Sequence, residues 1–322
     1  MAFYAETDCT DPFENLAREA LFCRFAAQTG EPLLYLWQNA PCVVIGVNQN
    51  PWLECDLTAM DADGVMLVRR RTGGGAVYHD GGNLNYSLCL PEALFDESRQ
   101  YAVLLAALAR LGISAQRSGR NDIVAGDLKI SGSAFLHSCG AALQHGTMLI
   151  RSELGIFGRY LTPDTQKFAS KGVRSVSARV GNLTALMPAL SIGDVKAAFY
   201  AAFEREYGAL SPATPPEPQT LAATAAEFSA WDFCFGRTPR FDKELARRFP
   251  FGLLRILVTV VNGIVTEAEA DSDMLEPAFP ARLATALPSL RFEAAAFSEA
   301  ASKLDSPFAA AVAAWLADPE LY

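Results

Sequence analysis

Glycines 73, 74 and 75 stand together between two apolar, strand-like stretches of the sequence. Each glycine loses more backbone freedom on folding than other residues do, so a run of three weakens any helix or strand that contains it. We therefore expect a loop here, which follows a strand at residues 65–69 and precedes a short apolar stretch, a His-Asp pair and a second pair of glycines.

The residues around these glycines suit an anion. Without Cβ atoms, the backbone N–H groups of the loop can point at phosphate or carboxylate oxygens, and Arg70 adds a planar, charged fork for bidentate contact. The same pattern also fits an ordinary loop beside a solvated arginine run. The residues alone leave both interpretations open.

The length, charge and composition of the chain limit which classes of protein it can belong to. The length of 322 residues predicts two domains, and the net charge of −9 argues against nucleic-acid binding. No segment approaches the ~18 uninterrupted apolar residues of a membrane-spanning helix. The first residues lack the features of a targeting segment, so the cytoplasm is the expected location. The seven cysteines show no metal-binding spacing and are expected to be reduced thiols.

The order of expected elements is mixed. Asp11 followed by Pro12 predicts the start of a helix over residues 11–22, and a second helix is expected at 101–111. Strands are expected at residues 33–37, 42–46, 65–69, 84–90, 122–125, 128–135 and 146–150. This order is not a regular βαβ alternation, so it predicts an α+β fold rather than a doubly wound sheet.

The last third is expected to form a small α+β unit. Prolines concentrated at residues 211–218 predict an extended segment and a candidate boundary. Asn262-Gly263 predicts a hairpin turn between strands at 253–261 and 264–270, and helical patterns follow at 279–286 and 292–315.

Several polar residues are candidates for chemistry, each with a structural alternative. Lys129, in an apolar strand, must reach solvent or face an anion. Asp122 suits either a magnesium ion beside a triphosphate or the capping of a turn. His79 suits either substrate contact or a structural hydrogen bond. The basic residues 167–183 suit either a loop over phosphates or a solvated strip.

The common nucleotide-binding motifs are missing from the sequence. It contains no G-x-x-x-x-G-K-[ST] loop, no G-x-G-x-x-G and none of the kinase signatures. A nucleotide would therefore need another glycine-rich cradle.

Together, the motifs resemble the lipoate–protein ligase A family in order and spacing over nearly the whole chain. The motifs that carry this resemblance are R-R-x-x-G-G-G-A-V-Y-H-D from Arg69, G-R-N-D from Gly119, G-D-x-K-I-S-G-S-A from Gly126, H-G-T from His145 and K-G-V-R-S-V from Lys171. The resemblance implies a mixed-sheet catalytic domain of the biotin/lipoate ligase type over residues 1–244 and a small α+β accessory domain over 245–322.

The resemblance also implies a two-step reaction. Lipoate and ATP, with Mg²⁺, would form lipoyl-AMP and diphosphate, and a carrier lysine would then attack the adenylate. The expected carriers are apo lipoyl domains of 2-oxoacid dehydrogenases or the glycine cleavage H protein, with no nucleic acid or membrane as partner.

Matching positions imply the roles of individual residues, with Lys129 as the catalytic residue. ATP would contact Arg70, Gly75, Ala76, Val77, Tyr78 and Lys129, with Asn83, Asn121 and Asp122 near the nucleotide and Asp122 as a magnesium ligand. The lipoyl group would contact Trp37, Arg70, Gly74, Gly75, His79, Lys129, Ala134 and His145. A loop over the adenylate would include Lys171, Gly172, Val173, Arg174, Arg179 and Asn182. The chain departs from the family pattern at Leu136, where some relatives carry Arg, and in a short loop before Lys129.

Two other functions are compatible with the superfamily. An ATP-independent octanoyl or lipoyl transferase needs a positioned nucleophilic cysteine, and none lies in the glycine loop or beside Lys129; Cys139 is the nearest candidate. A non-catalytic lipoate-binding or carrier-binding module would be expected to have lost the glycine-loop motif or the lysine. This sequence contains both the glycine loop and Lys129.

Overall fold

The computed structural model describes residues 1–161, 179–274, 276 and 278–322. The chain divides into two compact units, one made of Met1–Val47 and Gly64–Ala230 and the other of Asn48–Asp63 and Trp231–Tyr322. The predicted α+β class is confirmed, since the first unit holds a large mixed sheet and the second a separate antiparallel sheet. The last boundary between the units along the chain falls between Ala230 and Trp231, and the assignment of residues 1–244 and 245–322 to domains stays a prediction.

The first unit contains two sheets. The strands of the large sheet are β1 (Ala2–Glu6), β2 (Leu33–Trp37), β6 (Asn83–Pro91), β7 (Gln116–Ser118), β8 (Asp122–Ala125), β9 (Leu128–Ser138), β10 (Ala141–Leu149), β11 (Arg179–Val180) and β12 (Leu210–Pro212). Their order is β12-β1-β2-β6-β10-β9-β8-β7, and β11 pairs with β9. The small sheet has the order β4 (Met66–Arg69), β3 (Cys42–Ile45), β5 (Val77–His79).

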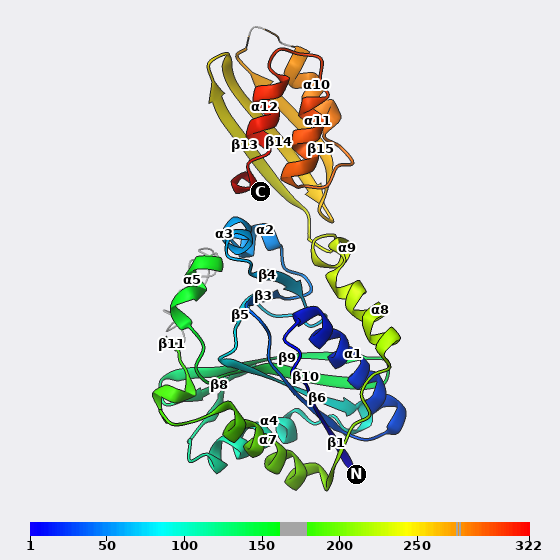
Figure 1. Ribbon diagram of the computed structural model, residues 1–322, viewed down its shortest axis with the longest axis vertical. Helices are drawn as coiled ribbons and strands as arrows, with labels where there is room; N and C mark the ends of the chain where they lie inside the picture. Colours follow the sequence, from blue (N-terminus) through cyan, green and yellow to red (C-terminus); the bar gives the residue numbers. More distant parts are fainter. Residues whose placement is uncertain (162–178, 275, 277) are drawn as a thin grey trace. The chain divides into compact units, whose positions relative to one another are not determined.

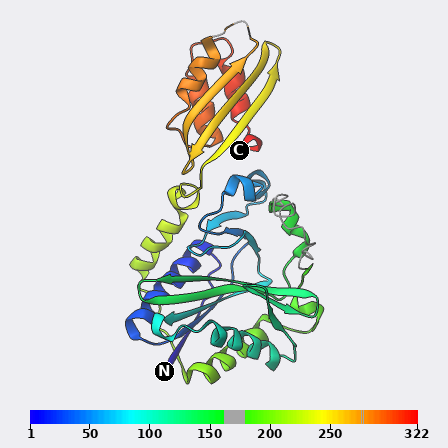
Figure 2. The same cartoon turned by 180° about the vertical axis from the view of Figure 1, so that it is seen from behind.

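Helices of this unit lie on both faces of the large sheet. They are α1 (Pro12–Thr29), α4 (Glu97–Arg110), α5 (Phe157–Tyr160), α7 (Ile192–Tyr207) and α8 (Pro218–Ser229), with short 3-10 turns η1 (Glu92–Leu94), η2 (Leu154–Ile156) and η3 (Leu183–Ala185). Figures 1 and 2 show α4 and α7 together on one face of the sheet and α1 on the other.

Alternating side chains along β2 and β6 give the large sheet one face in the hydrophobic core and one more polar face. Leu34 and Leu36 of β2 and Leu84 and Leu88 of β6 belong to the hydrophobic core that includes α4 and α7. Successive side chains of a strand point to opposite faces, so the intervening residues face α1. On β6 these are mostly polar, and one of them, Asn85, lies in the floor of the cavity described below.

Helix α1 begins where the sequence predicts. Asp11 accepts hydrogen bonds from the backbone N–H groups of Phe13 and Glu14, at 2.8 and 3.1 Å, and Pro12 occupies the first turn. The helix ends at Gly30, whose φ of 74° suits glycine. Leu16 and Glu19 lie on its buried side, where both help to build the site.

The proline-dense segment does not end the first unit. β12 pairs in parallel with β1, and α8 begins at Pro218 with Glu217 as its cap. Prolines are tolerated at an edge strand and at a first helical turn, which explains why the chain continues through them. The candidate boundary at residues 211–218 is therefore wrong for the compact units.

The second unit is a three-stranded antiparallel sheet with helices. Its elements are α2 (Pro51–Glu54), α3 (Leu57–Ala62), α9 (Trp231–Cys234), β13 (Phe241–Phe249), β14 (Gly252–Val261), β15 (Ile264–Ser272), α10 (Ala278–Ala286), α11 (Ala294–Ser302), α12 (Ala309–Leu316) and η4 (Pro319–Leu321). Figure 1 shows α10, α11 and α12 on one face of the sheet, where they share its buried core. The predicted Asn262-Gly263 turn is confirmed, with φ of 53° and 74°.

Two features of this unit differ from expectation. The helical pattern at 292–315 forms two helices, α11 and α12, with Pro307 in the segment between them, where a helix cannot continue. Trp52 of α2, from far upstream, packs against Phe235, Phe241 and Phe292 at ring-centroid distances of 5.3–5.5 Å.

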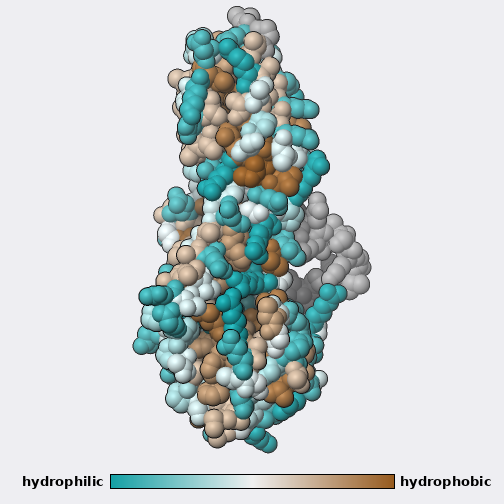
Figure 3. Space-filling view, turned by 90° about the vertical axis from the view of Figure 1, so that its right-hand side faces the viewer, coloured by the Kyte–Doolittle hydropathy of each residue, from teal (hydrophilic) through white to brown (hydrophobic). Residues whose placement is uncertain are grey.

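Among the described residues, none of the helices combines the length and the apolar character needed to cross a membrane. Figure 3 shows hydrophobic residues in separate patches among hydrophilic ones on the visible face.

Candidate functional site

A cavity of about 200 Å³ lies in the first unit on the polar face of the large sheet. One cross-strand row forms its floor, because strand register aligns one residue from each of five neighbouring strands. The row is Trp37 (β2), Asn85 (β6), Thr147 (β10), Gly132 (β9) and Asp122 (β8), and all five residues line the cavity.

The opposite wall comes from the small sheet and the glycine loop. Val44 of β3 pairs with Val77 of β5, and His79 follows two residues later on the same face. Gly74, Gly75 and Ala76 continue this wall, and Leu16 of α1 also lines the cavity. The cavity is therefore bounded by apolar side chains and backbone, with polar groups at defined places.

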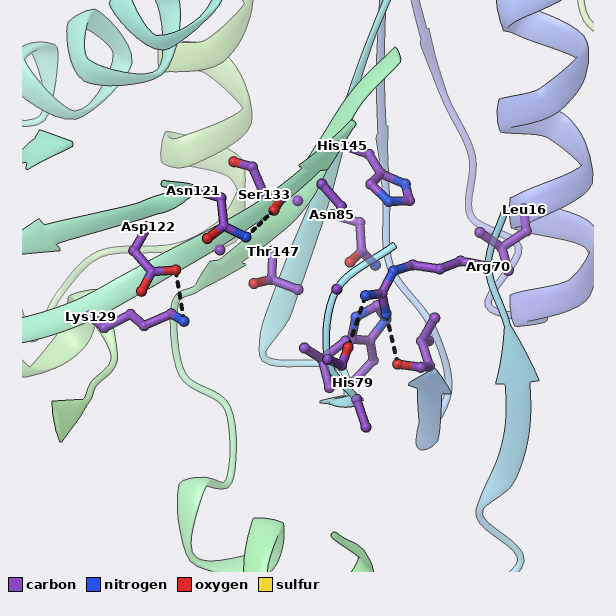
Figure 4. Close-up of a pocket in the computed structure, with 18 of the residues that line it drawn as sticks. Leu16, Arg70, His79, Asn85, Asn121, Asp122, Lys129, Ser133, His145 and Thr147 are labelled. Carbon is purple, nitrogen blue, oxygen red and sulfur yellow. Dashed lines mark hydrogen bonds and ion pairs between the residues drawn. The ribbon is translucent and has the colours of Figure 1, made fainter. Parts of the chain in front are cut away.

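Lys129 and Asp122 mark one side of the cavity, and Figure 4 shows them apart from Arg70, Asn85 and His79. Lys129 Nζ lies 2.8 Å from Asp122 Oδ1, and both side chains are partly exposed. Asn121 Nδ2 donates to the Ser133 carbonyl at 2.6 Å, and both residues line the cavity. Lys129 thus contributes a positive charge to the lining of the cavity, where it is paired with the Asp122 carboxylate.

Arg70 uses its donors to shape the glycine loop. Its Nη2 donates to the carbonyls of Gly73 and Gly75 at 2.6 and 2.8 Å, and its Nη1 donates to the Val44 carbonyl at 3.0 Å. Burial lowers the pKa of Arg70 to about 10, so the guanidinium stays charged at neutral pH. The Arg70 guanidinium, which the sequence analysis expects to contact an anion, is thus largely engaged by the carbonyls of the glycine loop and of Val44.

Close packing explains two glycines of this region. Gly74 has a φ of +95°, and a Cβ there would lie 2.8 Å from Arg70 Nη2; a Cβ at Gly46 would lie 2.3 Å from the Gly74 carbonyl oxygen. A Cβ at Gly75 would meet no described atom within 4 Å and would enter open space beside the cavity. Close packing of the protein therefore does not account for Gly75.

A buried hydrogen-bond network connects both walls. Glu19, only 5% exposed, accepts from His145 Nδ1 at 2.8 Å and from Ser87 Oγ at 2.6 Å. His145 Nε2 contacts Thr72 Oγ1 at 2.8 Å, and Arg70 Nε donates to the same oxygen at 3.0 Å.

The Glu19 carboxylate is also linked by hydrogen bonds to Trp37, at the β2 end of the floor row. Trp37 Nε1 donates to Ser87 Oγ at 2.9 Å, and Ser87 in turn donates to Glu19. Glu19 is therefore linked to both Trp37 and Arg70, although neither touches it directly.

The structure brings together most of the residues named from the sequence. Those that line the cavity are Trp37, Arg70, Gly74, Gly75, Ala76, Val77, His79, Asn121, Asp122, Lys129, Ala134 and His145. Two lie elsewhere. Tyr78 points to the other face of β5 and stacks on Tyr160 at 5.5 Å, and Asn83 is fully buried and donates to Asn85 Oδ1.

The expected loop over the adenylate is only partly placed. Lys171, Gly172, Val173 and Arg174 lie outside the described residues. Arg179 pairs with Leu128 in β11, beside the strand that carries Lys129. Asn182 exchanges hydrogen bonds of 2.9 and 2.8 Å with the backbone of Ser152. Leu136 lies on β9, two residues beyond Ala134, and does not line the cavity.

Sequence reasoning missed several residues of the cavity wall. They are Leu16, Val44, Asn85, Gly132, Ser133, Gly146 and Thr147. Strand alternation was the available signal, since Thr147 follows the predicted His145 by two positions and so shares its face.

Two family models match the chain. A family described as lipoyl protein ligase A/B catalytic domain matches residues 11–204, and one described as bacterial lipoate protein ligase C-terminus matches residues 238–314.

Solved structures of similar proteins include three with informative descriptions. P. falciparum LipL1, described in complex with lipoate, is 27% identical, with a TM-score of 0.65 over 98% of this chain and 99% of that chain. A bi-partite lipoate protein ligase of Thermoplasma acidophilum, described with its E2 lipoyl domain, is 28% identical, with a TM-score of 0.61 over 72% and 95%. A lipoate-protein ligase A bound with ATP is 27% identical, with a TM-score of 0.57 over 70% and 92%.

Proposed function

The chain belongs to the lipoyl protein ligase A/B catalytic domain family, and from that premise we propose that it activates lipoate with ATP and transfers the lipoyl group to a lysine of a carrier domain. The observation that carries the proposal is the position of Lys129, which faces a largely apolar cavity whose other wall is the glycine loop. Such a cavity suits an acyl chain with one anionic end.

In the first step, the lipoate carboxylate would attack the α-phosphate of ATP. A P–O bond forms to the carboxylate, and the bond to the leaving diphosphate breaks with its electron pair on the diphosphate oxygen. Two anions must meet for this, so the Lys129 ammonium and the N–H groups of the glycine loop would lower the repulsion and hold the reacting atoms in line. A Cβ at Gly75 would meet nothing within 4 Å, which is compatible with a phosphate beside this residue.

In the second step, the neutral ε-amine of a carrier lysine would attack the carbonyl carbon of lipoyl-AMP. The C–N bond forms, the mixed anhydride C–O bond breaks, AMP leaves with the electron pair, and the amine loses a proton. Lys129 would stabilise the oxyanion that develops on the carbonyl oxygen. The proposed carriers are lipoyl domains of 2-oxoacid dehydrogenases and the glycine cleavage H protein; the Thermoplasma acidophilum relative is described with an E2 lipoyl domain.

Asp122 is the residue that we assign to magnesium. It is the sole carboxylate among the described residues that line the cavity, and none of the described residues forms a cluster of three or more His, Cys, Asp or Glu side chains suited to a metal. One carboxylate fits an ion that arrives on the phosphates of ATP, because Mg²⁺ commonly combines one or two protein carboxylates with phosphate oxygens. Bound there, the ion would neutralise phosphate charge.

The rival transferase receives no support from the cysteines. None of the seven, all described, lines the cavity, and burial raises the pKa of Cys42, the one on the strand that supplies Val44. A nucleophilic cysteine needs a lowered pKa and access to the substrate. The free thiols fit a reducing compartment, so we keep the cytoplasm as the proposed location.

The test uses the full chain with lipoate, MgATP and an apo lipoyl domain, and it measures AMP release and the mass of the carrier. Lys129→Ala should lower kcat/KM by about 10²- to 10³-fold, the typical effect of removing a transition-state donor. Lys303→Ala, at an exposed lysine 70% accessible in its side chain, is the matched control and should react at the wild-type rate. Wild-type activity in Lys129→Ala would refute the role of Lys129, and octanoyl transfer from an acyl carrier without ATP would select the rival.

A further inference from the structure

Two side chains that line the cavity away from Lys129 each carry a buried donor without a partner among the described residues. His79 Nε2 and Asn85 Nδ2 have no hydrogen-bond partner among the residues that the structure describes, and their residues are 4% and 1% exposed. Both residues line the cavity, and Figure 4 shows them on the same side of it. An unpaired buried donor costs free energy, so each favours a ligand that supplies an acceptor.

A chain of amide hydrogen bonds fixes the proton on His79. Asn15 Nδ2 donates to the carbonyls of Cys9 and Gln38 at 3.0 and 2.9 Å, so its orientation is set by the backbone. The same nitrogen lies 3.0 Å from Asn39 Oδ1, which leaves Asn39 Nδ2 to donate to His79 Nδ1 at 3.1 Å. His79 Nδ1 therefore accepts, and the neutral ring carries its hydrogen on Nε2.

His79 stays uncharged in this environment. Burial lowers its pKa to about 3, and the charges of Arg70 and His145 act in the same direction. The unpaired group of this cavity-lining residue is thus a neutral N–H rather than a cation. It suits a neutral acceptor, while the carboxylate of an acyl substrate belongs at Lys129.

The spacing of the strands separates Asn85 from Lys129 by about the length of the acyl chain of the substrate. Asn85 lies between Trp37 and Thr147 in the floor row, and Gly132 is the next residue beyond Thr147. A Cβ at Gly132 would lie 3.7 Å from Lys129 Nζ. Two strand spacings of ~4.8 Å separate Gly132 from Asn85, close to the span of an extended eight-carbon chain. The ring of His79 also meets Trp37 edge-on, with centroids 6.5 Å apart.

We propose that His79, with Asn85, selects acyl chains that carry a sulfur acceptor at their distal end, the dithiolane of lipoate, over saturated chains such as octanoate. The placement of the carboxylate at Lys129 rests on the proposed function. A saturated chain leaves both donors unpaired when it fills the cavity, whereas a dithiolane sulfur, although a modest acceptor, can receive a hydrogen bond from one of them.

The test compares lipoate with cyclopentylpentanoate, in which methylene groups replace both sulfurs while the ring and chain are kept. Calorimetry should give the wild-type protein about fivefold tighter binding of lipoate, the difference expected of one neutral hydrogen bond. His79→Leu should bring the two dissociation constants together, mainly by weakening lipoate. His79→Gln, which keeps a side-chain N–H donor, should retain part of the preference. His137→Leu, at a histidine 46% exposed in its side chain and outside the cavity, should leave the preference unchanged.

Equal affinity of the wild-type protein for the two acids would overturn the proposal, and this comparison needs no variant to fold. An equal loss of affinity for both acids in His79→Leu would also overturn it, since the residue would then act only through the shape of the cavity. Ligation with ATP is measured separately. Absence of any carrier adduct would refute the proposed function, while the ratio of the two dissociation constants would still decide the selectivity of the cavity.

Discussion

At the scale of single residues, the site is held by a buried carboxylate that contacts neither the glycine loop nor the lysine. Glu19 accepts hydrogen bonds from His145 and Ser87. Through Ser87 it holds the ring of Trp37, and through His145 it holds the Thr72 hydroxyl, which accepts from Arg70. Buried networks of this kind specify one arrangement when every member is satisfied, and lose it when one member is removed. Glu19 is therefore a positioning residue.

We expect Glu19→Gln to lower kcat/KM for lipoate activation by about tenfold or more, because His145 Nδ1 and Ser87 Oγ both donate to Glu19 Oε1 and a neutral amide oxygen is a weaker acceptor than a carboxylate oxygen. The loss should fall mainly on kcat when ATP and lipoate are saturating, since Arg70 and the glycine loop would then be misplaced in the transition state. Steady-state kinetics, alongside thermal unfolding to establish that the variant is folded, measure this. Glu204→Gln, on the exposed side of α7, is the control. Kinetics equal to wild type in Glu19→Gln would show that the network does not position the site.

At the scale of elements, strand alternation decides which residues reach the cavity. The period of two explains why Asn85 lines it while Leu84 joins the core, and why Val77 and His79 face it while Tyr78 points away. The strands, the glycine loop and Lys129 can be found in the sequence because each has a local signal. The link between Glu19 and His145 cannot, since it joins positions 126 residues apart through the packing of α1 on β10.

The pairing of β10 with its neighbours depends on a missing side chain. A Cβ on Gly146 would lie 2.4 Å from the Tyr86 hydroxyl and 2.5 Å from the Gly132 carbonyl oxygen. Gly146→Ala should therefore reduce the free energy of unfolding by about 2 kcal/mol or more and disturb the floor row beside Thr147. Gly158→Ala is the matched control, because a Cβ there meets nothing within 4 Å, and its φ is not positive. Denaturant titration measures both. Equal stabilities of the two variants would contradict the expected clash.

At the scale of the whole molecule, the order of residues along the chain does not follow the division into units. Residues 48–63 lie in sequence between β3 and β4 of the first unit, yet they belong to the second. The sequence gives no local sign of this, because α2 and α3 read as an ordinary connection, and only the aromatic contacts of Trp52 reveal the assignment.

Trp52→Ala should destabilise the second unit by about 2–4 kcal/mol, since it removes a large ring from contact with three phenylalanines. Leu53→Ala, one residue later and 60% exposed, should change stability by less than about 0.5 kcal/mol. Hydrogen exchange of the amides in β13 and β14 would report the loss within this unit. Protection that is unaffected in Trp52→Ala would mean that the inserted segment contributes little to the unit.

The inserted segment also limits how this protein can be cut and recombined. A gene fragment that stops after Ala230 would still encode Trp52, now deprived of the aromatic side chains that shelter it, while a fragment that starts at Trp231 would produce a sheet-and-helix unit with a gap beside Phe292. Exchange of the second unit between relatives therefore requires replacement of two segments, residues 48–63 and 231–322, and so three junctions in the reading frame.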